Sequence, residues 1–218
     1  MLHQQFYLRE LEMYQLIHAR VPEILPSFEL LAQIPLESDP YLQPVLLLTD
    51  SVALFEQAPA QLNQAQVKQR LLHSLQMLAC LHQVGIVHGD LKPEHFRWQQ
   101  GRGVLIDFEQ SFIPGHIQSM GNHATPRYMA PELFHAEAKT MASDVYALGM
   151  IWYEWLTQQR IQKSSYLEWA KWHCQHFQIH LTETYEQWLP LLSKMLLKNK
   201  VQRLSEIAEI KQIFTKIV

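Results

Sequence analysis

The sequence predicts an α+β protein in which one helix and a small antiparallel sheet precede a mainly helical body. Two short runs rich in strand-forming residues, 28–34 and 44–48, are separated by a turn that carries proline and aspartate. A helical pattern of apolar residues precedes these runs, and from residue 143 onward the spacing is helical almost throughout.

The individual helices follow from local patterns. Residues 2–19 are predicted to form an amphipathic helix, because apolar side chains recur on one helical face. Val21-Pro22 ends it, since the residue before a proline avoids helical backbone angles. A longer helix is expected over 63–83. Its buried side carries an apolar residue at every turn: Val67, Leu71, Leu75, Leu78 and Leu81.

Composition restricts the functional class. With 218 residues, 48% of them hydrophobic, the chain can bury one large core, or a large lobe with a smaller one. The net charge of −3 offers no basic footprint for nucleic acid. No apolar run approaches the ~18–20 residues of a membrane span, and the pattern of a signal peptide is missing. Cys80 and Cys174 lie in helical patterns and suit packing in a reducing compartment, so we expect a cytoplasmic protein.

The most informative feature is HGDLKPEHF at 88–96, followed by VLIDFE at 104–109. It places Asp90 and Lys92 on a loop and Asp107 after three strand-forming residues. Phosphoryl transfer needs a carboxylate that orients or deprotonates the attacking hydroxyl, a cation that neutralises the transferred group, and a carboxylate that holds magnesium. The pattern therefore predicts Asp90 and Lys92 as catalytic residues and Asp107 as a metal ligand.

Four motifs in this order resemble those of the protein kinase family. The first is the pair of loops just described, which resembles the kinase catalytic loop and metal-binding loop. The others are TPRYMAPE at 125–132, SDVYALG at 143–149, and LLSKMLL at 191–197 followed by Arg203. The resemblance extends from about Phe6 to the end of the chain, and the ordered set is far more specific than any one motif.

The resemblance implies a protein-kinase-like α+β fold with a truncated N-lobe on a mainly helical C-lobe. Residues 1–50 would form the residual N-lobe, which consists of the C-helix and two strands, and residues 51–218 the C-lobe. It also implies that Asp144 accepts hydrogen bonds from the catalytic-loop backbone, and that Glu132 forms a buried pair with Arg203.

The implied cofactors are ATP and Mg²⁺. ATP would lie between the strand at 44–48, with its hinge residues Thr49, Asp50 and Ser51, and the loop at Asp107. Both cofactors are in question, because the family's Gly-rich loop and N-lobe lysine cannot precede the first helix: the first glycine and lysine are Gly85 and Lys68. Glu10 stands where the C-helix glutamate would be, without its usual lysine partner. We therefore expect weak ATP binding.

Three positions depart from the kinase pattern. Gly89 replaces an arginine, Glu109 replaces the glycine of D-F-G, and His95 replaces an asparagine. His95 remains a candidate second metal ligand, although magnesium prefers oxygen. The catalytic loop also resembles those of lipopolysaccharide core kinases, which place histidine before phenylalanine, and of aminoglycoside kinases, which share H-G-D.

Three functional hypotheses follow. The first is a divergent serine/threonine protein kinase, which Thr125 favours, because in that family the threonine lies near the catalytic aspartate and lysine and precedes the peptide-docking surface. The second is a pseudokinase that acts as a protein-binding scaffold or regulator. The third is a small-molecule or lipopolysaccharide sugar kinase. The first two are nearly level, and a protein is the expected substrate or partner in both.

Overall fold

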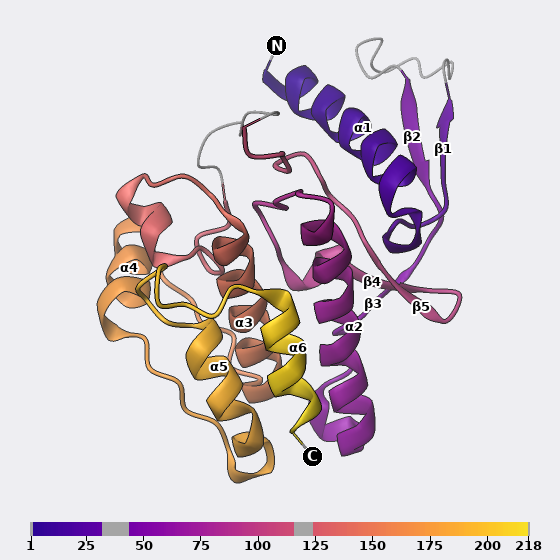
Figure 1. Cartoon of the computed structure of the whole chain (residues 1–218). Coiled ribbons are helices and arrows are strands. Elements are labelled where there is room, and N and C mark those ends of the chain that lie inside the picture. The colour runs from indigo at the N-terminus through magenta and orange to yellow at the C-terminus, as the bar shows by residue number, and fades with distance from the viewer. Residues whose placement is uncertain (1, 32–43, 116–123, 218) are drawn as a thin grey trace.

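The computed structural model describes residues 2–31, 44–115 and 124–217 of the chain. A long helix and a two-stranded sheet lie together at one end of the molecule, at the top of Figure 1. These elements are α1 (Leu2–Arg20), β1 (Phe28–Leu31) and β2 (Val45–Leu48). β1 and β2 are antiparallel, with Phe28 opposite Leu48 and Leu31 opposite Val45.

A second sheet lies below the first and has the strand order β3-β4-β5, antiparallel throughout. Its strands are β3 (Val52–Ala53), β4 (Phe96–Gln99) and β5 (Arg102–Leu105). The chain passes from one sheet to the other between Leu48 and Val52. The predicted boundary after residue 50 falls at this point, and the division into two lobes stays a prediction.

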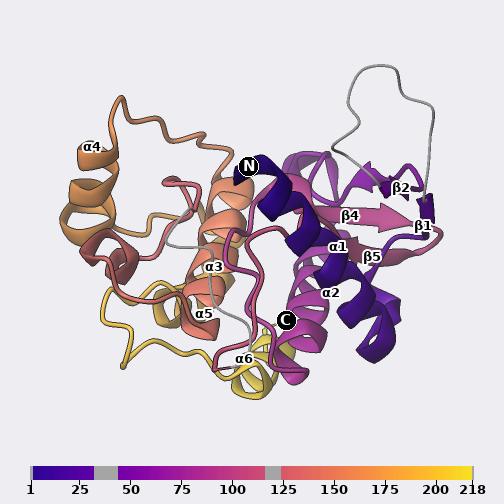
Figure 2. The same ribbon diagram turned by 90° about the horizontal axis from the view of Figure 1, so that it is seen from above.

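Helices form the rest of the structure. They are α2 (Gln64–Gln83), α3 (Met141–Thr157), α4 (Tyr166–Lys171), α5 (Leu189–Met195) and α6 (Ile207–Thr215). A π-helical turn continues α4 over Trp172–His176, and short 3₁₀ turns cover Pro22–Ile24, Pro59–Gln61, Pro93–His95, Pro131–His135 and Glu183–Trp188. Figure 2 shows α4 on the opposite side of α3 from α1 and the strands.

The core forms where the apolar faces of these helices meet. All five apolar positions expected on the buried side of α2 are at most 1% exposed. α3 is buried over most of its length, and its Trp152 packs against Trp188 and Phe214 of the neighbouring segments. On α1, Met13, Tyr14 and Ile17 are fully enclosed, whereas Leu8 is half exposed. α1 therefore contributes mainly its C-terminal half to the core.

The predicted fold class is confirmed: small antiparallel sheets accompany a mainly helical body. The predicted helices 2–19 and 63–83 match α1 and α2 to within one residue at each end. β1 ends at Leu31, and positions 32–34 of the predicted strand lie outside the described residues. Within the part that the structure describes, no helix has the length and apolar character that crossing a membrane requires.

Candidate active site

Asp144, in the first turn of α3, anchors the backbone of the loop at 88–96. Asp144 accepts hydrogen bonds from the backbone N–H of His88 at 2.8 Å and of Gly89 at 2.9 Å, and His82 Nε2 lies 3.0 Å from the same carboxylate. Burial alone would raise the pKa of Asp144. The hydrogen bond and charge of His82, the nearby His88 and the backbone hydrogen bond from Gly89 outweigh burial and hold the pKa below its usual range. The predicted role of Asp144 is confirmed.

Gly89 has a structural reason to lack a side chain. Its φ is +82°, a conformation that favours glycine, and a β-carbon here would lie 2.8 Å from the carbonyl oxygen of Gln110. Lys139 packs against the same point, with its Cδ 3.2 Å from that position. The Lys139 side chain is buried and its Nζ donates to Gln110 Oε1 at 3.3 Å. Burial lowers its pKa to about 8, opposed by the carboxylates of Asp90, Asp144 and Glu109.

Asp90, Lys92 and Thr125 come together from two segments. Asp90 Oδ1 accepts a hydrogen bond from the backbone N–H of Thr125 at 2.7 Å, and its Oδ2 lies 3.4 Å from Lys92 Nζ. The side chains of Asp90 and Lys92 are 15% and 22% exposed, so both are enclosed yet accessible to a substrate. The structure thus places the two predicted catalytic residues beside the predicted substrate-binding threonine.

Asp107 faces His95 across the site, with Oδ2 2.9 Å from His95 Nε2. Burial would raise the pKa of Asp107, but the hydrogen bond and charge of His95, aided by His88 and Lys92, hold the pKa below its usual range. Asp107 has a φ of +66°, a strained conformation for a residue with a side chain. His95 therefore keeps the carboxylate ionised and oriented.

The donors around Asp107 fit magnesium only as part of a nucleotide complex. Among residues 2–31, 44–115 and 124–217, no three acidic, histidine or cysteine side chains are grouped to hold a metal ion. Magnesium commonly takes one or two carboxylates and completes its shell with water and substrate phosphates. Asp107, whose side chain is 35% exposed, fits that single carboxylate. His95 already contacts Asp107, and its assignment as a ligand stays a prediction.

His88 and Phe108 form the buried base of the site. The His88 ring lies 5.5 Å from Phe108 and 5.6 Å from His95, and all three side chains are enclosed. Burial and the neighbouring His95 lower the pKa of His88 to about 4, so it is neutral at physiological pH. Tyr14 of α1 packs edge-on against Phe108 at 5.2 Å. His88 therefore packs as a neutral, buried ring between Phe108 and His95.

Glu10 brings a third carboxylate to this region. Burial raises its pKa to about 7, reinforced by Asp107 and Glu109 and opposed by a hydrogen bond from the backbone of Phe108. Within the described part of the chain, no ion pair joins Glu10 to a lysine or arginine. The lysine partner that the resemblance leads one to expect is thus not replaced by another described residue.

The predicted hinge is already bonded to two side chains of β4. Gln99 Nε2 donates to the carbonyl oxygens of Thr49 at 3.2 Å and Asp50 at 3.4 Å. Arg97 donates from Nε to Ser51 Oγ at 3.2 Å and from its second guanidinium nitrogen to the Ser51 carbonyl oxygen. Sequence reasoning missed Arg97 and Gln99, because nothing in the residues around them indicates a contact with the hinge. The hinge's role in nucleotide binding stays a prediction.

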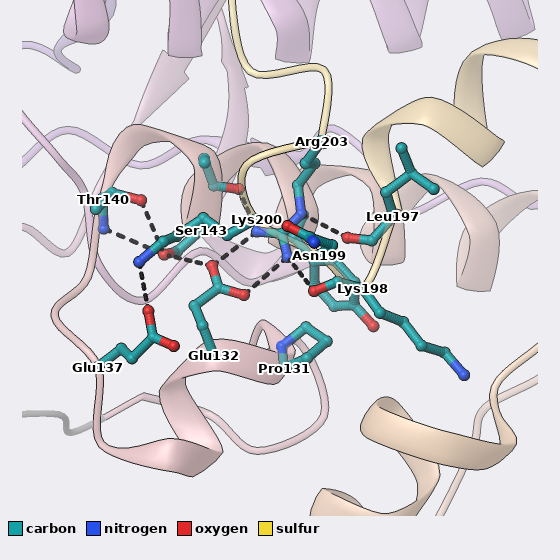
Figure 3. Close-up of polar contacts among 12 residues, drawn as sticks. Pro131, Glu132, Glu137, Thr140, Ser143, Leu197, Lys198, Asn199, Lys200 and Arg203 are labelled. Carbon is teal, nitrogen blue, oxygen red and sulfur yellow. Dashed lines mark hydrogen bonds and ion pairs between the residues drawn. The ribbon is translucent and has the colours of Figure 1, made fainter.

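The predicted pair of Glu132 and Arg203 is confirmed, and Figure 3 shows the two side chains facing each other. Arg203 donates to both carboxylate oxygens at 2.7 Å, and the two side chains are 0% and 4% exposed. Ser143 donates to Glu132 at 3.1 Å from the start of α3. Such a two-pronged, buried contact fixes the segment that ends at Glu132 against the helical body.

A cavity of about 690 Å³ opens beside Thr125. Its lining includes Pro126, Arg127 and Trp169, so part of it is formed by the segment that the sequence associates with peptide docking. Arg127 lies 3.4 Å from Glu154 within this lining. Thr125 joins this cavity to Asp90, whose carboxylate accepts from the Thr125 N–H.

Comparison with known proteins agrees with this geometry. The Protein kinase domain family matches residues 2–216. A probable serine/threonine-protein kinase PknB of Bifidobacterium longum is 33% identical over 102 residues, which are 44% of this chain and 15% of that protein. The serine/threonine-protein kinase PkaA of Streptomyces coelicolor is 37% identical over 87 residues, or 37% and 16% of the two chains.

A similar match reaches a eukaryotic protein. The calcium/calmodulin-dependent protein kinase type 1B of Homo sapiens is 39% identical over 77 residues, which are 34% of this chain and 22% of that kinase. In all three comparisons the chain covers less than a quarter of the relative's length. Because the family match takes in nearly every residue, the chain belongs to the protein kinase domain family.

Proposed function

We propose that this chain is a divergent serine/threonine protein kinase that transfers a phosphoryl group from ATP to a protein hydroxyl. The observation that carries the proposal is the convergence of Asp90, Lys92 and Thr125. A chain that had lost transfer chemistry would have no need to keep an aspartate and a lysine in contact at an accessible position. The serine/threonine kinases among its relatives support the same reading.

The proposed roles follow from the contacts. Asp90, fixed by the Thr125 N–H, would accept the proton of the substrate hydroxyl and orient it. Lys92, held beside Asp90, would balance the negative charge that gathers on the transferred group. Asp107, oriented by His95, would hold Mg²⁺, which when bound neutralises and positions the ATP phosphates. Among the described residues Glu10 has no lysine partner, and we therefore expect weak nucleotide affinity.

The decisive experiment is Asp90→Asn, assayed with radiolabelled ATP on protein substrates and on the chain itself. We expect phosphotransfer to fall by ~10²–10⁴-fold, the usual contribution of a positioned acid or base. Folding and nucleotide binding should remain, because Asp90 contacts the acceptor side. The exposed Glu186→Gln serves as a matched control and should keep wild-type transfer.

Glu10 and the hinge favour the second candidate, a pseudokinase scaffold. Glu10 lies near Asp107 and Glu109 without a cationic partner among the described residues, and side chains occupy the predicted hinge. If wild type and Asp90→Asn both transfer no phosphate yet complement a deletion strain equally, the scaffold replaces the kinase. Transfer to a sugar or an antibiotic, but to no protein, would instead support a small-molecule kinase.

A further inference from the structure

Arg97 and Gln99 of β4 are two residues apart, so alternation along the strand places their side chains on one face. Both side chains reach the hinge. His95 ends the 3₁₀ turn just before the strand and reaches Asp107. Trp98 points the other way, with its ring 4.7 Å from His73 of α2.

This order along the strand places Arg97 beneath the proposed nucleotide. A nucleotide that runs from the hinge to Asp107 has its base near Gln99 and its phosphates near His95. Arg97 lies between these two positions along the chain, two residues from each. Its guanidinium is turned toward the hinge, where it donates to both the hydroxyl and the carbonyl oxygen of Ser51.

At the hinge end of the site, Gln99 forms hydrogen bonds with both the nitrogen and the oxygen of its side-chain amide. While Nε2 donates to the carbonyls of Thr49 and Asp50, Oε1 accepts from the backbone N–H of Ser27 at 3.0 Å. Gln99 is 5% exposed, so it is part of the packed interior rather than a mobile surface side chain. All three hinge carbonyls therefore already accept a hydrogen bond from a side chain, and a base that binds there must compete with these donors.

We infer that Arg97 and Gln99 take over the base-reading positions of the hinge, so that the site binds magnesium polyphosphates with little regard to the base. This inference rests on the nucleotide binding of the proposed function and specifies its ligand class. The charge of Arg97 agrees with it, since a cation bound at the hinge makes the site more positive and so favours an anionic ligand.

The test measures the dissociation constants of the Mg²⁺ complexes of ATP, GTP, CTP and tripolyphosphate by calorimetry. For the wild type we expect the three nucleotides to agree within about threefold and tripolyphosphate to compete with them. In Arg97→Leu/Gln99→Leu, which frees the hinge carbonyls, ATP should become preferred over GTP by about tenfold or more. Arg97→Leu alone should give part of this preference, in case the buried Gln99 cannot be replaced.

Arg102→Leu is the matched control. Arg102 lies on the neighbouring strand β5 and likewise donates to backbone carbonyls, those of Glu23 and Leu25, away from the hinge. It should leave the nucleotide preference unchanged. Thermal unfolding of each variant confirms that differences in binding do not reflect loss of the fold.

The outcomes separate this inference from the proposed function. If the wild type binds ATP about tenfold more tightly than GTP, the base is read and the inference fails, while the kinase proposal stands. An unchanged preference in the hinge variants overturns it equally. If neither the wild type nor the variants bind any of the four ligands and no phosphate is transferred, the proposed function fails and the ligand assignment fails with it.

Discussion

Asp144 is a fully enclosed carboxylate that makes three hydrogen bonds with two segments of the chain. His88 and Gly89 donate from the catalytic loop, and His82 approaches from α2. A buried charge is stable only where such partners replace water. The same carboxylate therefore fixes the backbone of the loop that carries Asp90. The hydrogen bonds that stabilise the buried charge of Asp144 thus also determine the position of the proposed catalytic residue.

Asp144→Asn should therefore destabilise the fold without changing the volume of the side chain. An amide oxygen can still accept from one N–H, but the amide nitrogen turns a donor toward another donor. We expect a loss of ~2–4 kcal/mol in the free energy of unfolding, measured by urea denaturation. Asp50→Asn, which alters an exposed aspartate, should change it by less than ~0.5 kcal/mol. Equal effects of the two substitutions would contradict the supporting role of Asp144.

At the scale of elements, the π-helical turn after α4 supports the segment that follows Thr125. His173 lies in this turn, where Nε2 donates to the carbonyl oxygen of Pro126 at 3.0 Å and Nδ1 accepts from the hydroxyl of Tyr146 at 2.8 Å. These contacts satisfy a neutral imidazole completely. Burial lowers the pKa of His173 to about 3, although its bonds to the Pro126 and Arg127 backbone oppose the shift.

The stability of the protein should therefore depend on pH through His173. The unfolded chain binds a proton near pH 6.5, and the folded chain does so only near pH 3. The stabilisation is present above pH 6.5 and is lost as the pH falls toward 3. In His173→Gln, the slope of the unfolding free energy against pH between 4 and 6.5 should be smaller than in the wild type. The reduction should be up to ~1.4 kcal/mol per pH unit. The exposed His176→Gln in the same turn should keep the wild-type slope.

The elements show which features could be predicted from the sequence. Asp144, Glu132 and Arg203 could be assigned because each stands at a fixed place in a motif, and their contacts follow from the family's topology. Lys139 and Arg97 could not, because lysine and arginine are normally exposed and nothing in their local sequence indicates a buried partner. Their roles arise only when the fold brings Gln110 and Ser51 beside them.

At the scale of the whole molecule, α1 packs against the loop that carries Asp107 and Phe108 through aromatic and acidic side chains of opposite effect. Tyr14 packs against Phe108 in the core, whereas Glu10 lies near the carboxylates of Asp107 and Glu109. Packing of the aromatic rings stabilises the closed arrangement, and repulsion among the carboxylates opposes it. The protonation of Glu10 therefore affects how firmly α1 is held against the rest of the fold.

Glu10→Gln should stabilise the protein at alkaline pH in the absence of divalent cations. Its pKa rises from 4.5 to about 7 in the folded state, so the folded chain binds a proton that the unfolded chain has released. Stability from this group is lost as the pH rises from about 4.5 to about 7, and the variant avoids that loss. We expect a gain of ~1–3 kcal/mol at pH 8 and little gain at pH 4.5, from urea unfolding in a chelating buffer.

The difference between variant and wild type is the quantity to measure, because neutral buried histidines such as His173 give the opposite slope. Glu12→Gln is the control on the same helix, since the Glu12 side chain is 59% exposed and pairs with Arg9 at the surface. It should change stability little at either pH. A Glu10→Gln gain that is the same at pH 4.5 and pH 8 would show that the carboxylate acts through packing rather than through its charge.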